Sequence, residues 1–235
     1  AGADIINGGS DNDTFIYLTT ADLVASNALV DKLTGGGGTD SIVINNNGRA
    51  VFTLASTDLI EARMSGVEQI VVAGASDQII SIIASDGLFE AGLTIIDLSA
   101  DTDATADNVI DVSNDDTGAN AWTLTGSAGI DAITGDSGVD TITGGAGADV
   151  IAGGDGDDSL IYLLTADLFA SQAIVDTSIA GNGGAGDQLT VGTSGTAFAV
   201  ADTDVWTGIT TVEKVVAVAN TAAVTVDLDL TADAA

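Results

Sequence analysis

The hydrophobic residues between positions 41 and 125 gather in short clusters, and Gly, Asp, Asn and Ser fill the intervals between the clusters. This alternation is typical of β-strands joined by turns. The clusters are Ile42–Ile44, Val51–Leu54, Val67–Val72, Ile79–Ile83, Leu93–Leu98, Val109–Val112 and Trp122–Leu124. Apolar strands are also expected at Thr14–Leu18 and Ser159–Leu164. The pattern predicts successive rungs of an irregular parallel β-solenoid.

A stricter pattern occupies residues 126–161, which divide into four consecutive nonapeptides: GSAGIDAIT, GDSGVDTIT, GGAGADVIA and GGDGDDSLI. Each has Gly at positions one and four, Asp at position six and Ile or Leu at position eight. The glycines permit a turn with positive φ, the Asp supplies a carboxylate, and the Ile or Leu on a short strand points inward. If position eight accepts any large hydrophobic residue, residues 8–16 and 35–43 fit the pattern with at most one departure, and residues 182–190 fit less well.

Two nonapeptides would complete one coil of a flattened solenoid. Alternate turns then stack on the same edge, about 4.8 Å apart, which is the spacing of neighbouring strands. Two Asp carboxylates and several backbone carbonyls would converge between stacked turns. A set of hard oxygen ligands suits Ca²⁺ better than Mg²⁺ or Zn²⁺.

A longer repeat contains the short one. Residues 2–31 recur without a gap at residues 147–176, an offset of 145 residues, and the similarity continues with a small insertion as far as Val212-Glu213. The chain therefore holds one full period and the beginning of a second. Each nonapeptide block is followed by Thr-Ala-Asp-Leu, where Thr20 or Thr165 could cap a short helix. Its face would hold Leu23, Ala28 and Leu29, and a further short helix is expected at Ser56–Arg63.

The charge balance agrees with a cation-binding chain. The 35 acidic residues face only four Lys and Arg, so the formal net charge is −31, although 46% of the residues are hydrophobic. Asp outnumbers Glu by 31 to four, and a short carboxylate in a tight turn can reach an ion beside backbone carbonyls. The acidity argues against nucleic acid and anionic membrane surfaces as partners. No apolar stretch approaches the roughly 20 residues that a transmembrane helix needs.

The tandem nonapeptides resemble the RTX family, whose repeats form a calcium-binding β-roll. The resemblance implies that each Ca²⁺ takes carbonyls from positions one and three of one turn and two and four of the next, together with both sixth-position Asp residues. Carried over, one site comprises Gly126, Ala128, Asp131, Gly145, Gly147 and Asp149. The second comprises Gly135, Ser137, Asp140, Gly154, Gly156 and Asp158.

Other Asp residues are further candidates for this set. Asp4 and Asp13 are the counterparts of Asp149 and Asp158 in the first copy, and their partner turns would lie upstream of residue 1. Asp40 and Asp187 stand in isolated nonapeptides, where calcium binding and an ordinary turn role are equally open. Asp31 and Asp176 are either additional ligands or turn residues, and the turn role is slightly favoured.

We therefore expect an all-β chain, a parallel β-roll or β-solenoid with calcium-binding glycine–aspartate turns and short helical excursions. The expected divisions are residues 1–16, the end of an RTX calcium roll; 17–34, a loop with a short helix; 35–125, irregular solenoid rungs; 126–161, the four-nonapeptide roll; 162–180, a second loop with a short helix; and 181–235, the start of the second solenoid copy.

Catalysis has little support in this sequence. His and Cys are absent, which excludes Ser–His and Cys–His nucleophiles within the chain. The Asp residues occupy repeated equivalent positions, as a structural role requires. Trp122 and Trp206 could stack on sugars, but a place in the core is the preferred interpretation.

The segment Gly66-Val67-Glu68-Gln69-Ile70, which follows a nonapeptide, resembles calcium-dependent bacterial surface-layer proteins, and giant RTX adhesins share these features. The resemblance implies a secreted cell-surface protein, exported by type I secretion, that folds on binding extracellular Ca²⁺. Its expected partners are calcium ions and neighbouring repeats or other copies of the chain, with a cell-surface glycan as a further candidate. The alternative is the calcium-binding portion of a secreted RTX enzyme or toxin whose catalytic domain lies elsewhere.

Overall fold

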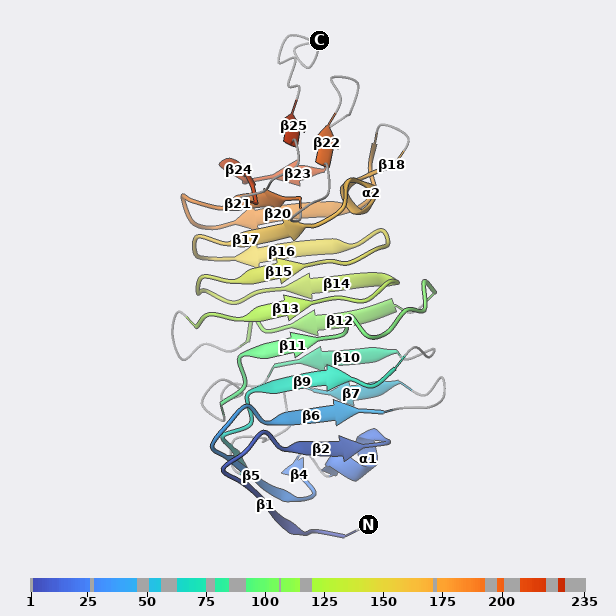
Figure 1. Cartoon of the computed structure of the whole chain (residues 1–235), viewed down its shortest axis with the longest axis vertical. Helices are drawn as coiled ribbons and strands as arrows, with labels where there is room; N and C mark the ends of the chain where they lie inside the picture. The colour runs from blue at the N-terminus through green and yellow to red at the C-terminus, as the bar shows by residue number, and fades with distance from the viewer. Residues whose placement is uncertain are drawn as a thin grey trace.

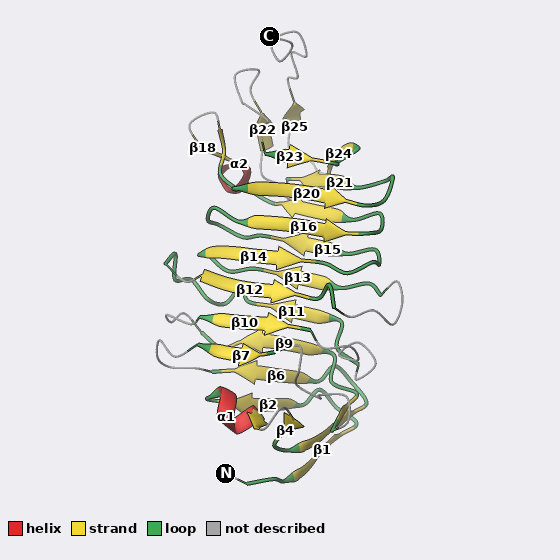
Figure 2. Cartoon of the chain, turned by 180° about the vertical axis from the view of Figure 1, so that it is seen from behind, coloured by secondary structure: helices red, strands yellow, loops and turns green. Residues whose placement is uncertain are grey.

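The computed structural model describes residues 2–25, 28–45, 51–55, 63–74, 79–84, 92–105, 107–114, 120–170, 173–192, 198–200, 208–218 and 224–226. The chain winds into a tall stack of flat coils, with the N-terminal coil at one end and the C-terminal coils at the other (Figure 1). Two parallel sheets run along the stack and face each other (Figure 2). The all-β parallel solenoid predicted from the sequence is confirmed.

The nine-stranded sheet begins near the N-terminus at Thr14, whereas the seven-stranded sheet begins only at Phe52, because the earlier strands Ile5–Gly9 and Lys32–Gly36 belong to a smaller sheet. The nine-stranded sheet has the order β2 (Thr14–Tyr17), β6 (Ser41–Ile44), β9 (Gln69–Val72), β11 (Ile95–Asp97), β13 (Thr123–Thr125), β15 (Thr141–Thr143), β17 (Ser159–Tyr162), β21 (Gln188–Val191) and β24 (Lys214–Ala217). The seven-stranded sheet has the order β7 (Phe52–Leu54), β10 (Ile80–Ile83), β12 (Asp107–Asp111), β14 (Ile130–Thr134), β16 (Val150–Gly154), β20 (Ser178–Asn182) and β23 (Ile209–Thr210).

Smaller sheets complete the described strands. A three-stranded parallel sheet contains β1 (Ile5–Gly9), β5 (Lys32–Gly36) and β8 (Met64–Ser65), and β22 (Phe198–Val200) pairs in parallel with β25 (Val224–Val226). The antiparallel pairs are β3 (Val24–Ala25) with β4 (Ala28–Leu29) and β18 (Phe169–Ala170) with β19 (Ala173–Ile174). The helices are α1 (Thr20–Leu23) and α2 (Thr165–Leu168).

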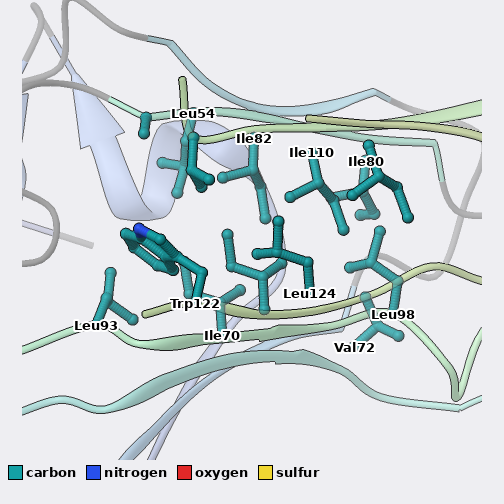
Figure 3. Packing of buried hydrophobic residues seen from close by; sticks show 14 of the residues in the cluster. Leu54, Ile70, Val72, Ile80, Ile82, Leu93, Leu98, Ile110, Trp122 and Leu124 are labelled. Carbon is teal, nitrogen blue, oxygen red and sulfur yellow. The ribbon is translucent and has the colours of Figure 1, made fainter. Parts of the chain in front are cut away.

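The core is a double row of aliphatic side chains between the two sheets. The eighth residues of the nonapeptides stack in register, Ile133 on Ile151 and Ile142 on Leu160, and all four are at most 1% exposed. In the irregular rungs, side chains such as Ile82 and Leu124 meet from opposite sheets (Figure 3). Trp122 is also 1% exposed, so it is a core residue as expected, whereas Trp206 lies outside the described residues.

The 145-residue repeat is visible in the fold. The elements from β1 to β6, including α1 and its hairpin, recur in the same order from β16 to β21, and β1–β5 and β2–β6 pair as β16–β20 and β17–β21 do. The two helices project from the same edge of the stack (Figure 2). We call this the helix-side edge, where the chain crosses from the nine-stranded to the seven-stranded sheet, and the other one the far edge.

The expected helical excursions are shorter than the sequence suggested. Each helix has four residues, and α1 is capped by Thr19, whose hydroxyl accepts the Asp22 N–H, while Thr20 is its first helical residue. Thr165 likewise begins α2, which has no side-chain cap. The predicted helix face with Ala28 and Leu29 is wrong, because Val24 ends the helix in an extended conformation and the chain continues as a hairpin. The β-branched Val24 favours that conformation.

No helix in the described residues is long enough to span a membrane. The expected helix at Ser56–Arg63 lies, apart from Arg63, outside the described residues.

Core packing leads to a first prediction. Replacing Ile151 by Ala should lower the free energy of unfolding of the calcium-saturated protein by about 2–5 kcal/mol, because it leaves a cavity between the sheets. Val139→Ala is the matched control, since Val139 is 58% exposed in a turn and its loss should cost less than about 0.5 kcal/mol. Urea unfolding measures both variants, and equal losses would contradict this packing.

Candidate calcium site

The sixth-position aspartates of the nonapeptides point into the solenoid. Asp140, Asp149 and Asp158 are fully buried, and Asp131 is 1% exposed. The first glycine of each nonapeptide makes room for its own carboxylate: an added Cβ at Gly144 or Gly153 would overlap the Oδ2 atom of Asp149 or Asp158. Each carboxylate therefore folds back under its own turn instead of extending into solvent.

One oxygen of these carboxylates joins successive coils. The Asp131 N–H donates to Asp149 Oδ1 at 2.9 Å on the helix-side edge. The Asp140 N–H donates to Asp158 Oδ1 at 2.8 Å on the far edge. The structure thus brings together the two aspartate pairs that the sequence assigned to the two predicted sites.

The same hydrogen bond, from the backbone N–H of one aspartate to the carboxylate of the aspartate in the next coil, recurs beyond the four contiguous nonapeptides. We call the whole series the Asp ladder. The Asp149 N–H donates to Asp176 at 3.0 Å, and the Asp158 N–H donates to Asp187 at 2.7 Å. The first copy repeats both contacts, from Asp4 to Asp31 at 3.0 Å and from Asp13 to Asp40 at 2.7 Å. Asp4 and Asp13 themselves are less covered than Asp149 and Asp158.

Asp31 and Asp176 are buried members of the ladder on the helix-side edge. Tyr17 and Tyr162 donate their hydroxyl groups to the second carboxylate oxygen of Asp31 and Asp176, respectively. Burial, together with the adjacent carboxylate, raises the pKa of both tyrosines, so the hydroxyls keep their protons. A Tyr placed 14 residues before an Asp in both copies was the available sequence signal.

The second carboxylate oxygen divides the turns into two classes. In Asp131 and Asp140, Oδ2 accepts the N–H of the second turn residue, Ser127 at 2.7 Å and Asp136 at 2.9 Å. In other ladder members Oδ2 is buried and has no hydrogen-bond partner among the described residues. These are Asp13, Asp40, Asp149, Asp158 and Asp187.

The conformation of the second turn residue accounts for this division. In all five turns with an unpaired Oδ2 this residue has a left-handed backbone, with φ between 74° and 125°. Four are glycines, Gly9, Gly36, Gly145 and Gly154, and the fifth is Asn182, which pairs in register with Gly154, so that Gly181 is the first residue of its turn. Ser127 and Asp136 do not have positive φ. Glycine adopts positive φ without steric cost. Nonapeptides that begin with Gly-Gly therefore have a sixth-position aspartate whose Oδ2 atom is buried and lacks a hydrogen-bond donor.

Backbone carbonyls line the same gaps between turns. An added Cβ at Gly145, Gly147, Gly154 or Gly156 would overlap the carbonyl oxygen of Ser127, Gly129, Asp136 or Gly138, respectively. In the opposite direction, the Gly144 and Gly153 carbonyls lie against Gly126 and Gly135. The facing carbonyls of the earlier turn therefore belong to positions two and four, whereas the predicted donors Gly126, Ala128, Gly135 and Ser137 are at positions one and three. Which carbonyls act as ligands stays a prediction.

Burial destabilises the charged form of these carboxylates when no cation compensates it. Desolvation raises the pKa of Asp149 and Asp158 to about 7 and that of Asp131 and Asp140 to about 6. Within the described residues, no three acidic side chains form a metal-binding group. A cation at these turns would therefore depend on paired carboxylates supplemented by backbone carbonyls. Unpaired carboxylate oxygens beside carbonyls form an all-oxygen donor set, which fits a hard cation such as Ca²⁺.

Comparison with protein families agrees with this chemistry. Residues 1–23 and 125–160 match the family model of the RTX calcium-binding nonapeptide repeat, in four copies. RTX nonapeptides bind calcium, so Ca²⁺ is the cofactor of these turns. Comparisons with curated proteins and with solved structures found no match.

The raised pKa values predict how the calcium-free chain responds to pH. Because the folded state binds protons more tightly than the unfolded state, this contribution to stability is fully present below the ordinary Asp pKa of about 4. It is lost as the pH rises through about 6 to 7, the folded pKa range of Asp131, Asp140, Asp149 and Asp158. In calcium-free buffer, the β-structure measured by far-UV circular dichroism should therefore be greater at pH 5 than at pH 8.

General charge repulsion at −31 would act in the same direction, so the variant Asp149→Asn/Asp158→Asn separates the two causes. It should show a clearly smaller pH dependence than Asp97→Asn/Asp111→Asn, which removes two partly exposed carboxylates that only cap local turns. Equal pH dependence of the two double variants would show that the buried carboxylates are not responsible.

Proposed function

We propose that this chain, which carries RTX calcium-binding nonapeptide repeats, is a calcium-dependent structural segment of a secreted bacterial cell-surface protein, such as a surface layer, a filament or an extended adhesin. The observation that supports it most directly is one repeated geometry. Buried aspartates with an unpaired oxygen recur on both edges of the stack and in both copies of the long repeat. A chain built from equivalent positions suits a scaffold, and the RTX solenoid is a structural calcium-binding fold.

Ion binding and folding are coupled through the buried carboxylates of the turns. In the unfolded chain, water solvates Asp149 and Asp158. In the folded chain, each retains one hydrogen bond from the preceding coil and buries its other oxygen without a donor. Leaving a buried charge uncompensated costs several kcal/mol. Bound Ca²⁺ supplies two positive charges and accepts six to eight oxygen ligands at about 2.3–2.6 Å. The free energy of binding thereby becomes free energy of folding.

This coupling suits export from the cell. Extracellular calcium modules bind in the range of about 10⁻⁴–10⁻³ M, far above the free calcium of a cytoplasm. With a net charge of −31, the calcium-free chain repels itself and stays largely unfolded before secretion. On this proposal folding takes place outside the cell, as an extracellular location and type I secretion require.

The tandem repeat supports an array of stacked coils. Ile5 in β1 is 84% exposed, whereas its counterpart Val150 in β16 is 42% exposed and pairs with β14 of the preceding coil. Within the described residues, the corresponding edge of β1 has no partner strand. We propose that a neighbouring repeat or another copy of the chain packs against that edge, because an open strand edge readily accepts a further strand.

The alternative is the calcium-binding portion of a secreted enzyme or toxin. The 145-residue tandem period favours the scaffold, because an appendage of an exoenzyme usually carries one compact roll. A calcium titration combined with size measurement distinguishes the two, since growth of large particles with calcium supports assembly.

The purified chain, titrated with Ca²⁺ from a chelated starting state, should gain β-structure cooperatively in far-UV circular dichroism at sub-millimolar to millimolar calcium. Mg²⁺ should not replace it. Asp149→Asn/Asp158→Asn should raise the calcium midpoint roughly tenfold or more, equivalent to at least about 1.4 kcal/mol. Asp97→Asn/Asp111→Asn is the matched control, because it removes the same charge from partly exposed turns and should leave the midpoint nearly unchanged.

A chain that is fully folded in chelator and unaffected by calcium would contradict the proposed function.

A further inference from the structure

On the far edge, the Asp ladder of each copy ends on a glutamate that lies outside every nonapeptide. The Asp40 N–H donates to Glu68 Oε2 at 2.7 Å, and the Asp187 N–H donates to Glu213 Oε2 at 3.0 Å. The N–H groups of the two glutamates donate in return to the carbonyls of Asp40 and Asp187. Each glutamate therefore occupies the place that the next sixth-position aspartate would take in a regular roll.

The aspartate facing each glutamate has an oxygen available for a ligand. Asp40 and Asp187 are fully buried, and the Oδ2 atom of each has no hydrogen-bond partner among the described residues. Both are preceded by a second turn residue with a left-handed backbone, as are Asp149 and Asp158. Asp40 and Asp187 thus belong to the same class as the aspartates of the Gly-Gly turns in the contiguous roll.

A carbonyl from the glutamate's own turn lies beside this unpaired oxygen. An added Cβ at Gly35 would overlap both Asp40 Oδ2 and the Gly66 carbonyl oxygen. In the second copy, an added Cβ at Gly181 would overlap both Asp187 Oδ2 and the Thr211 carbonyl oxygen. The regular roll has the same arrangement at Gly135, between Asp140 Oδ2 and the Gly153 carbonyl oxygen. The donor geometry of the nonapeptide turns therefore extends one coil further.

The residue two positions before each glutamate has the same backbone conformation in both copies, although its identity differs. Gly66 has φ 59°, and its counterpart Thr211 has φ 54°. A left-handed backbone is sterically unfavourable for a β-branched residue. Thr211 nevertheless keeps this conformation, and its carbonyl oxygen lies against Gly181 as that of Gly66 lies against Gly35.

The longer side chain of glutamate has a geometric reason. The turn between β8 and β9 spans only residues 66–68, whereas the nonapeptide turn between β5 and β6 spans residues 37–40. A carboxylate on the shorter turn starts from a different backbone position, and the additional methylene of Glu68 lets it reach the N–H of Asp40.

We propose that Glu68 and Glu213 are calcium ligands, each completing a site with the buried aspartate and the turn carbonyl of its copy: Asp40 and Gly66 in the first, Asp187 and Thr211 in the second. The inference rests on the proposed function, because it assumes that calcium binds the nonapeptide turns. It adds two sites beyond the contiguous roll and makes calcium order the first irregular rung, so that roll and solenoid fold together.

The test counts bound ions in the calcium-saturated chain by isothermal titration calorimetry and by elemental analysis after gel filtration. Glu68→Gln and Glu213→Gln keep the side-chain length and an oxygen for the aspartate N–H, but remove the charge. Each variant should bind one Ca²⁺ fewer per chain than the parent protein. Asp97→Asn is the matched control and should bind the full number, because within the described residues Asp97 accepts a local hydrogen bond from the Ser99 N–H and takes no part in the Asp ladder.

Asp40→Asn should remove the same ion as Glu68→Gln, so the double variant should lose no more than either single variant. If Glu68→Gln fails to fold by circular dichroism, Glu213→Gln decides, because Glu213 is exposed in the last described coil of the nine-stranded sheet. Unchanged ion number and affinity in the folded glutamate variants would overturn the inference and leave calcium-coupled folding intact. A parent chain that binds no calcium would instead overturn the proposed function.

Discussion

The structure depends on the burial of carboxylates along the edges of a stack of coils. Each buried aspartate uses one oxygen to accept the backbone N–H of the coil before it, so the same side chain closes its own turn and joins two coils. The arrangement is costly for a charged group in a dry site, as the raised pKa of Asp149 and Asp158 indicates. The aliphatic core stabilises the sheets, but the turns need a cation to compensate their charge.

The two edges of the stack resolve this constraint differently. On the helix-side edge, the ladder passes to Asp31 or Asp176, where a tyrosine hydroxyl donates to the second carboxylate oxygen. On the far edge, it passes to Asp40 or Asp187, whose second oxygen stays without a donor, and then to a glutamate. At the last aspartate of each ladder, a neutral donor thus satisfies the carboxylate on the helix-side edge, while on the far edge the second oxygen remains available to a cation. Both copies preserve the difference, so it is a property of the repeat.

The second residue of the turn has a comparable effect within the contiguous roll. Ser127 and Asp136 turn their N–H groups toward the carboxylate of their own repeat, whereas Gly145 and Gly154 do not. Four similar nonapeptides therefore supply two kinds of carboxylate. Position two acts through its backbone, because its N–H satisfies the aspartate in the two repeats of this roll where this position is not glycine.

The sequence by itself determined the solenoid, its coil length and the buried eighth position, because strict periodicity leaves one register in which the Ile and Leu side chains stack inside. It also predicted which aspartates pair across coils, since two nonapeptides make one coil. The hairpin after each helix, the Tyr–Asp contacts and the role of Glu68 and Glu213 required the tertiary structure. Their partners lie 14 to 28 residues away in non-repetitive segments. Only the stacking of coils brings them together, because loop lengths outside the nonapeptides do not reveal which residues share an edge.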